Sequence, residues 1–314
     1  MYSIGIDLGG TNIAVGVVNE QGAILAQAST PTLAGRPFEE LIADMAACAN
    51  KAVSQAGLTL DDIDRVGIGI PGVSKDGVVI FCTNLGWENE PLRAELQKHI
   101  NKPVYIDNDA TVAGLAESVA GISKDTHSSV FVTLGTGVGG GIVIDGKPWS
   151  GFHGVGSEIG HMILVSGGVQ CTCGNKGCLE RYCSATALIR MGREALEKHP
   201  DSLMMSLCGH EPQKLNAKHV IDAAREKDPA GCEAFEAYTD YLAQAIATII
   251  TFLDPEVVVL GGGVSRAGAF LLDSVRAKVP NYLIFKTMPY SRVELAELGN
   301  EAGIIGAAML GRKA

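Results

Sequence analysis

Two glycine-rich turns, each between two apolar segments, limit most strongly how this chain can fold. The first lies in IGIDLGGTNIAVGVVNEQG at residues 4–22, and the second lies in VFVTLGTGVGGGIVIDGKP at residues 130–148. In both, β-branched residues run up to the turn and resume directly after it, which predicts a β-hairpin. A Rossmann fingerprint or a P-loop needs a glycine turn that opens a helix. Neither of these nucleotide-binding motifs is therefore expected.

A glycine hairpin can still bind phosphate. Because glycine has no side chain, backbone N–H groups reach phosphate oxygens, and Thr11 and Thr136 would add hydroxyl donors. One such hairpin could be an ordinary tight turn, but two in matching contexts favour a clamp around an oligophosphate. The turn residues that we assign to nucleotide binding are Gly9, Gly10, Thr11, Asn12, Gly135, Thr136, Gly137 and Gly139.

The segments after the two hairpins also match. After the first come a helix with apolar residues at helical spacing between Phe38 and Val53 and then the strand RVGIGIPG at residues 65–72. After the second, beyond a cysteine-rich segment, come a helical stretch at residues 232–253 and the strand VVVLGGGV at residues 257–264. The order of hairpin, helix, strand and glycine turn therefore occurs twice, which predicts two related α/β halves.

Composition narrows the class of partner. The chain has 314 residues, 46% hydrophobic and 19% charged, which suits one large or two moderate domains with ample core. Its net charge is −10 without a long block of either sign, which argues against a general nucleic-acid or anionic-membrane surface and favours a small molecule. The start, MYSIGIDLGG, lacks the features of a signal peptide, and the longest apolar run, AIATIITFL, is too short to span a bilayer. We therefore expect a cytoplasmic protein.

The segment HMILVSGGVQCTCGNKGCLERYC, at residues 161–183, contains four of the eight cysteines. Cys171, Cys173 and Cys178 form C-x-C-x4-C, and the glycines between them let three thiolates converge. With His161 as the fourth ligand they would form a Cys3His structural zinc site. A redox site would need C-x-x-C, and a Cys171–Cys173 disulfide would be strained. Reduced, packed cysteines remain the alternative, and apolar filler is expected for Cys48, Cys82, Cys183, Cys208 and Cys232.

Four motifs together make the chain resemble the ROK family of sugar kinases and repressors. They are D-L-G-G-T-N, L-G-T-G-V-G-G-G, E-I-G-H and C-T-C-G-N-K-G-C-L-E, in the family's order and spacing over essentially the entire chain. The resemblance implies a duplicated actin-like ATPase (ribonuclease H-like) α/β fold, with two domains around a nucleotide and sugar cleft. We expect an N-terminal domain at residues 1–118, joined by a C-terminal helix at 301–314, and a larger domain at 119–300 that carries the zinc loop.

The resemblance also implies an activity. Repressors of the family carry an N-terminal helix-turn-helix domain, for which a first strand at about Tyr2 leaves no room, so we expect an enzyme. T-N-L-G-W at residues 83–87 looks like the bacterial glucokinase branch. The expected reaction is ATP-dependent phosphorylation of a hexose at its C6 hydroxyl, glucose first, with Mg2+ and structural zinc, in a homodimer or homotetramer. N-acetylmannosamine, N-acetylglucosamine, allose or fructose as substrate, and a non-catalytic sugar-binding regulator, are the alternatives.

By this resemblance Asp109, in Y-I-D-N-D-A, is the general base that takes the proton from the attacking hydroxyl. Asn108 would hold a neighbouring sugar hydroxyl, while Asp107 has either a supporting or a turn role. The residues alone leave open that Asn108 or Asp109 simply caps a helix. Many relatives have asparagine where this chain has Thr111.

The remaining site assignments also come from the resemblance. Glu158 and His161, three residues apart, would both face the sugar if they lie on one helical turn. His161 would bind zinc with one ring nitrogen and sugar with the other. A salt-bridged surface glutamate and a packed histidine are the alternative. Further assignments are Glu180, Asn84 and Gly72 to the sugar, Asp7 to Mg2+, and Gly261, Gly262, Gly263 and residues 301–304 to the adenosine.

Overall fold

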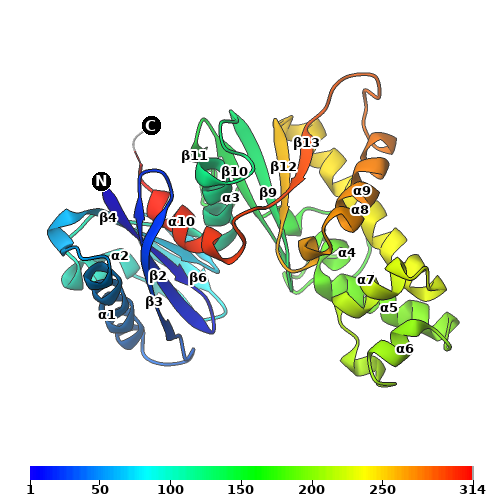
Figure 1. The fold of residues 1–314 in the computed structure, drawn as a ribbon, viewed down its shortest axis with the longest axis horizontal. Coiled ribbons are helices and arrows are strands. Elements are labelled where there is room, and N and C mark those ends of the chain that lie inside the picture. Colours follow the sequence, from blue (N-terminus) through cyan, green and yellow to red (C-terminus); the bar gives the residue numbers. More distant parts are fainter. Residues whose placement is uncertain (313–314) are drawn as a thin grey trace. The chain divides into compact units, whose positions relative to one another are not determined.

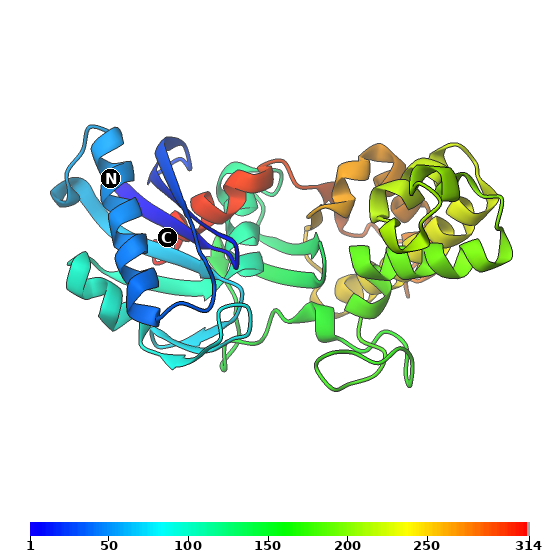
Figure 2. The same ribbon diagram turned by 90° about the horizontal axis from the view of Figure 1, so that it is seen from below.

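The computed structural model describes residues 1–312, and the chain forms two compact units (Figure 1, Figure 2). Unit 1 contains Met1–Phe131, Gly141–Ser157 and Ala296–Ala314, of which residues 313 and 314 lie outside the described part. Unit 2 contains Val132–Gly140 and Glu158–Leu295. The division into an N-terminal domain of residues 1–118 and a larger domain of residues 119–300 stays a prediction.

Unit 1 is built on a five-stranded sheet of order β3-β2-β1-β4-β8. The first turn connects two antiparallel neighbours, with Asp7 opposite Ala14, so the predicted hairpin is confirmed. Strands β1, β4 and β8 are parallel, which brings their carboxyl ends to one edge of the sheet. The strands are β1 (Tyr2–Leu8), β2 (Asn12–Asn19), β3 (Ile24–Pro31), β4 (Ile63–Ile70) and β8 (Val104–Asn108).

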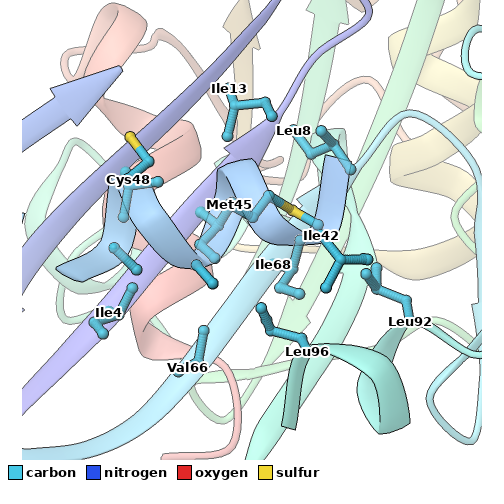
Figure 3. Close-up of a cluster of buried hydrophobic side chains, with 14 of the residues drawn as sticks. Ile4, Leu8, Ile13, Ile42, Met45, Cys48, Val66, Ile68, Leu92 and Leu96 are labelled. Atoms are coloured by element: carbon cyan, nitrogen blue, oxygen red, sulfur yellow. The ribbon is translucent and has the colours of Figure 1, made fainter. Parts of the chain in front are cut away.

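Helix α1 (Phe38–Gln55) covers one face of this sheet, and its buried stripe follows the helical spacing seen in the sequence. Figure 3 shows Ile42, Met45 and Cys48 of α1 packed in one cluster with Ile4 and Val66 of the strands. Helix α2 (Leu92–His99) completes the cluster. An additional three-stranded sheet contains β5 (Val73–Lys75), β6 (Val78–Cys82) and β7 (Trp87–Glu90).

A second group of helices in unit 1, α3 (Asp109–Ala120) and α10 (Ala302–Met309), forms separate apolar clusters with the strands. Helix α10 lies directly on β1, since a Cβ added at Gly5 would be 1.9 Å from the Ile304 carbonyl oxygen. The expected helix at 301–314 is wrong in its bounds among the described residues. It ends at Met309 because Leu310 is extended and Gly311 has a φ of 71°.

The second sheet repeats the strand order of the first. Its order is β11-β10-β9-β12-β13, with β12 and β13 parallel, which confirms the predicted duplication. The second glycine turn joins β9 to its sheet neighbour β10, again as a hairpin rather than a strand and helix. The strands are β9 (Ser128–Leu134), β10 (Val138–Ile144), β11 (Lys147–Pro148), β12 (Val257–Gly261) and β13 (Arg292–Leu295).

Helix α8 (Pro229–Leu253) is the central helix of unit 2 and packs against α5, α7 and α9. It begins where the Asp228 side chain accepts the Gly231 N–H and Pro229 occupies the first turn, and it ends at Asp254 in the left-handed region. Within residues 1–312, no helix combines the length and apolar character that crossing a membrane requires. The other helices are α4 (Glu180–Cys183), α5 (Ala185–Lys198), α6 (Leu203–Leu207), α7 (Ala217–Arg225) and α9 (Ala269–Lys278).

Candidate functional site

The residues that the sequence assigns to the site divide between the two units, and each set is described within its own unit. Unit 1 holds Asp7, Gly9, Gly10, Thr11, Asn12, Gly72, Asn84, Asn108 and Asp109. Unit 2 holds Gly135, Thr136, Gly137, Gly139, Glu158, His161, Cys171, Cys173, Cys178, Glu180 and Gly261–Gly263.

The first glycine turn is closed by backbone hydrogen bonds. The Gly9 N–H donates to the Asn12 carbonyl at 3.0 Å. Thr32, at the end of β3, holds the turn from the side: its hydroxyl donates to the Gly9 carbonyl at 2.6 Å, and its N–H donates to the Thr11 carbonyl at 3.0 Å. Among the backbone bonds of turns and loops within residues 1–312, none has the N–H of Gly10 or Thr11 as its donor, which is the condition for these groups to bind an anion.

Asp7 ends β1 next to this turn and lies against the first turn of α10. A Cβ added at Gly303 would be 2.4 Å from the Asp7 carboxylate, so only glycine leaves room for that carboxylate. Burial raises the pKa of the Asp7 carboxyl. A half-buried carboxylate beside a phosphate-sized turn is the type of oxygen ligand that Mg2+ takes in nucleotide sites, directly or through water.

Asn108 and Asp109 stand where β8 ends and α3 begins. The Asn108 side chain caps the helix, accepting the N–H groups of Ala110 at 2.9 Å and Thr111 at 3.4 Å. Helix capping and a site role are therefore compatible, because the amide nitrogen of the same side chain can donate elsewhere. It donates to the Gly72 carbonyl at 3.3 Å.

The unit 1 set therefore gathers at the carboxyl edge of the sheet. Gly72 follows β4, Asn108 and Asp109 follow β8, and the first turn follows β1. Asn84 joins them from the turn after β6, with its Cβ 3.6 Å from the position that a Cβ on Gly10 would occupy. In open α/β sheets this edge is where ligands bind.

Asp107 supports this edge from within. Its carboxylate accepts the Ser150 hydroxyl at 3.0 and 2.9 Å and the Asn108 N–H at 2.8 Å. Burial raises the pKa of the Asp107 carboxyl, and the two hydrogen-bond donors oppose that shift. The structure thus gives Asp107 a supporting role rather than a turn role.

In unit 2 the second turn repeats the closure of the first, with the Gly135 N–H donating to the Gly137 carbonyl at 3.0 Å. The structure brings Glu180 to this turn. Its carboxylate accepts the Val138 N–H at 3.1 Å, and a Cβ added at Gly137 would be 2.2 Å from a Glu180 carboxylate oxygen. Gly137 is therefore required for the carboxylate's position.

Glu158 and His161 lie on one turn of 3-10 helix, Ile159–His161, in which the His161 N–H donates to the Glu158 carbonyl at 3.1 Å. Residues three apart eclipse one another in this helix type, as the spacing predicts. The turn packs on the start of β10, because a Cβ added at Gly160 would be 2.0 Å from the Val138 carbonyl oxygen. Glu158, His161 and Glu180 are thus all attached to the second hairpin.

His161, Cys171, Cys173 and Cys178 converge, with their ligand atoms within 4.8 Å of one another. The Cys171 Sγ lies 3.8 Å from His161 Nδ1, and the Cys173 and Cys178 Sγ atoms are 3.6 Å apart. Bonds of about 2.3 Å to sulfur and 2.0 Å to nitrogen separate the ligands of tetrahedral zinc by about 3.5–3.8 Å. The four residues therefore fit a structural zinc ion, with Nδ1 of His161 as the ligand nitrogen.

The local chain and the thiol chemistry agree with this fit. Gly177 has a φ of 87°, and a Cβ there would be 1.7 Å from the Val165 carbonyl oxygen, so only glycine allows the loop to close. Burial, followed by hydrogen bonding to Cys173, raises the pKa of the Cys178 thiol to about 12. A buried thiol of this kind becomes a thiolate when a cation binds it. The five remaining cysteines form no disulfide within residues 1–312.

The third glycine turn, Gly261–Gly263, follows β12. Gly262 lies against β9, with a Cβ position 2.7 Å from the Leu134 backbone. Gly263 borders a cavity of about 370 Å3 between α7 and the segment after β12, and Lys218, Arg225 and Arg266 are among its lining residues. The cavity gives this turn an adjoining space of ligand size in unit 2.

Comparison with known proteins shows which family has these motifs. The model of the ROK family matches residues 3–314. The chain belongs to the ROK family. It is 39% identical to a glucokinase of Thermotoga maritima over 98% of this chain and 96% of that protein. It is 32% identical to an N-acetyl-D-glucosamine kinase of Vibrio cholerae over 98% and 99% of the two chains. A solved ROK family glucokinase from Streptomyces griseus, in complex with glucose and AMPPNP, superposes with a TM-score of 0.82 at 34% identity over 100% of both chains.

Sequence reasoning missed residues that hold the ROK motifs in place. Ser150 contacts Asp107, Ser157 contacts Thr111, and buried Glu117 accepts the N–H groups of Glu297 and Leu298. The serines lie in a glycine-rich segment that resembles an ordinary loop. Glu117 lies in a helix where a glutamate is normally solvated. An indication in the sequence exists for Ser157 alone, because this serine stands directly before the E-I-G-H motif.

Proposed function

We propose that this ROK family protein is an ATP-dependent glucokinase, which transfers the γ-phosphoryl group of ATP to the C6 hydroxyl of glucose. The observation that carries the proposal is the position of Asp109, directly after Asn108 at the carboxyl edge of the unit 1 sheet, the edge that also carries the first glycine turn. A carboxylate there suits a general base for a sugar hydroxyl. Full-length similarity to glucokinases supports glucose as the sugar.

Within this proposal Asp109 takes the proton of the attacking hydroxyl as the oxygen bonds to phosphorus. Asn108 and Asn84 hold neighbouring hydroxyls, and the backbone at Gly72 completes the unit 1 contacts. The other sugar hydroxyls form hydrogen bonds with Glu158, His161 and Glu180 of unit 2. The large number of polar contacts to one small ligand serves orientation, which contributes much of the rate in phosphoryl transfer.

The glycine turns hold the nucleotide in this proposal. Backbone N–H groups of both hairpins bind the phosphates, and Asp7 holds Mg2+, which neutralises charge on the phosphate oxygens when bound. The turn Gly261–Gly263, with its adjoining cavity and the segment 301–304, borders the adenosine.

Zinc does no chemistry here. It orders the cysteine loop and, through Nδ1, leaves Nε2 of His161 directed to the sugar.

We further propose a cytoplasmic homodimer. Exposed apolar side chains of unit 2, called the patch below, support it, and they belong to Phe252 at the end of α8 and to the segment before β13. Tyr282 hydrogen-bonds Asp240 of α8 at 2.6 Å, and the Arg292 N–H bonds the Glu256 carbonyl just beyond α8, so the segment runs along that helix. The patch residues, 40–84% exposed, are Phe252, Tyr282, Ile284, Phe285, Met288 and Tyr290.

The size of this patch favours a second copy of the chain as the occupant. Large side chains present about 150–250 Å2 each, so at these exposures the six offer roughly 600–700 Å2, near the ~800 Å2 per partner of a standard interface. Sedimentation of Phe285→Glu beside the wild type tests this: the wild type is expected to be dimeric and the variant monomeric. A variant that stays dimeric would assign dimerisation to another surface.

The activity is tested by ADP release with MgATP and a panel of glucose, mannose, N-acetylmannosamine, N-acetylglucosamine, allose and fructose, with a no-sugar control. Glucose-dependent turnover is expected. Preference for N-acetylglucosamine, which the Vibrio cholerae relative phosphorylates by its name, would keep the mechanism and change the substrate. Sugar binding without turnover on any sugar would instead indicate a non-catalytic regulator.

A further inference from the structure

The segment 150–157, SGFHGVGS, is hydrogen-bonded at both ends to residues that bracket Asp109. At its start the Ser150 hydroxyl donates to the Asp107 carboxylate at 2.9 and 3.0 Å. At its end the hydroxyl of Ser157 bonds the hydroxyl of Thr111 at 3.0 Å. Asp107 and Thr111 stand two residues before and two residues after Asp109, so the segment holds both sides of that position.

The Thr111–Ser157 bond is the better shielded of the two contacts. Thr111 is 0% exposed and Ser157 is 6% exposed, and both belong to unit 1. A buried hydroxyl left without a partner costs about 1–3 kcal/mol, so each hydroxyl constrains where the other can lie. Thr111 sits in the first turn of α3, whose first residue is Asp109. A displacement of Thr111 therefore displaces the backbone that carries Asp109.

The side chain at the tip of the segment adds little packing to its ends. Phe152 is 87% exposed, and its ring contacts only His153 and the Lys75 ammonium, 5.2 Å from the ring centre, among the described contacts. Gly151 and Gly154 have φ values of 74° and 79°. The Gly156 N–H donates to the Ser150 carbonyl at 2.8 Å and closes the segment on itself, and the side-chain bonds of Ser150 and Ser157 attach the closed segment to Asp107 and Thr111.

Ser157 is also the residue directly before Glu158. A hydrogen bond that fixes Ser157 fixes the point in the chain from which Glu158 starts. The chain therefore leaves unit 1 at a residue whose hydroxyl bonds that of Thr111.

We infer that Thr111 and Ser157 are positioning residues for phosphoryl transfer, whose paired hydroxyls hold the first turn of α3 and with it the proposed base Asp109. This inference rests on the proposed function. A buried hydroxyl pair that served stability alone would change the melting temperature and leave the catalytic parameters in place. A pair that serves position changes kcat, because a displacement of about 1 Å at a reacting group costs about 100-fold in rate.

The test compares Thr111→Val, which removes the hydroxyl at nearly constant shape, with Thr111→Ser, which keeps it. We expect Thr111→Val to lower kcat about 10- to 100-fold with the KM for ATP within about threefold, and Thr111→Ser to recover most of the rate. Ser157→Ala should lower kcat similarly, and the double variant should be no slower than the slower single variant, since both remove one bond. The measurements are steady-state kinetics for glucose and ATP.

Thr239→Val is the control, because Thr239 is a buried threonine in unit 2, outside the proposed sugar and nucleotide sites, whose hydroxyl donates to the Phe235 carbonyl at 2.9 Å and accepts from Lys278 and Ser274. It should lower the melting temperature and keep kcat. If Thr111→Val or Ser157→Ala melts earlier but keeps the wild-type kcat, the pair is structural and the inference is overturned. If Thr111→Val does not fold, Ser157→Ala and Thr111→Ser decide by the same criterion. An inactive wild type would remove the proposed function as well, whereas an active wild type with equally active variants removes this inference alone.

Discussion

Units 1 and 2 repeat the same strand order and the same glycine hairpin, yet they present their polar side chains in different ways. In unit 1, Asn108 and Asp109 stand at a strand end and a helix start, on regular elements. In unit 2, Glu158 and His161 stand on a single 3-10 turn, next to a loop whose described pairing is limited to isolated bridges such as Ile163 with Cys178. One fold thus uses two kinds of support for its site.

The segments that carry these side chains differ in how they are ordered. Regular elements satisfy their own backbone hydrogen bonds and bury apolar faces, so the edge that carries Asp109 is ordered by the core of unit 1. Between residues 162 and 178 the chain forms no regular helix or strand; its backbone hydrogen bonds close turns, as where the Cys171 N–H donates to the Asn175 carbonyl at 2.8 Å, and closing such a loop costs conformational entropy. Four metal-ligating side chains at its base compensate for that cost when zinc binds. The comparison therefore predicts that the turnover rate depends most on Asp109 in unit 1 and that the glucose affinity depends on the zinc ion in unit 2.

The largest effect is expected at Asp109. Asp109→Asn keeps a hydrogen-bonding group but removes the base, so kcat should fall about 10²- to 10⁴-fold while glucose binding stays within about tenfold. Kinetics and calorimetric titration with glucose measure the two quantities. Asp107→Asn in parallel shows whether any nearby carboxylate has this effect. Unchanged turnover in Asp109→Asn would show that Asp109 is not the general base.

Unit 2 should respond to loss of its metal instead. Cys173→Ser is expected to lose zinc and to weaken glucose binding about 10- to 100-fold, because His161 then loses the partner that orients it. Metal content and glucose affinity are measured on the purified protein. Cys232→Ser, which changes a partly exposed cysteine of α8 outside the cluster, should alter neither. Full glucose affinity in zinc-free Cys173→Ser would contradict the support role of the loop.

The two glycine turns should differ in a smaller way. A methyl group at Gly137 meets the Glu180 carboxylate at 2.2 Å, whereas one at Gly10 meets only Asn84 Cβ at 3.6 Å, an ordinary contact. Gly137→Ala should therefore raise the KM for glucose about tenfold by displacing Glu180, at little cost in stability, since the end of a flexible side chain moves. Gly10→Ala should leave the KM for glucose within about twofold. Equal KM values for glucose in the two variants would show that Glu180 does not bind the sugar.

The smallest effect concerns the pH dependence of stability. Burial raises the pKa of the Asp107 carboxyl in the folded protein. As pH rises past the ordinary value near 4, the unfolded chain loses this proton first, so folding stability falls until the pH passes the folded pKa. Asp107→Asn should remove this fall. Ser150→Ala should enlarge it, because the Ser150 hydroxyl opposes the shift.

Urea unfolding between about pH 4 and pH 7 measures the unfolding free energy of the wild type, Asp107→Asn and Ser150→Ala. The difference in unfolding free energy between wild type and Asp107→Asn should decrease steadily as pH rises. A difference that is constant, or that grows with pH, would show that the Asp107 pKa is not raised in the folded state.

The local elements of this fold could be predicted because their signals are short in range. Alternating β-branched residues around Gly9 and Gly135 predict hairpins, and the apolar spacing from Phe38 to Val53 predicts α1. The bounds of α10 were less predictable. Its apolar sequence runs to Leu310, and the helix stops where Leu310 turns extended before Gly311.

Part of the candidate site could also be predicted from spacing. Cysteines within eight residues of one another with glycines between them can reach one point, and His161 is close enough in sequence to join them. The bond of Glu180 to Val138 could not be predicted, because it joins residues 42 positions apart and depends on where the cysteine loop returns.

The sequence by itself determined the duplication, the two glycine hairpins and the Cys3His cluster, since each depends on residue type and local spacing. Only the tertiary structure decided that Asn108 both caps α3 and bonds Gly72, that Gly137 makes room for Glu180, and that Thr111 meets Ser157. The physical reason is the range of the interaction. A hydroxyl or a carboxylate has the same local signature whether it is solvated or paired, and its partner is known only when distant segments have packed.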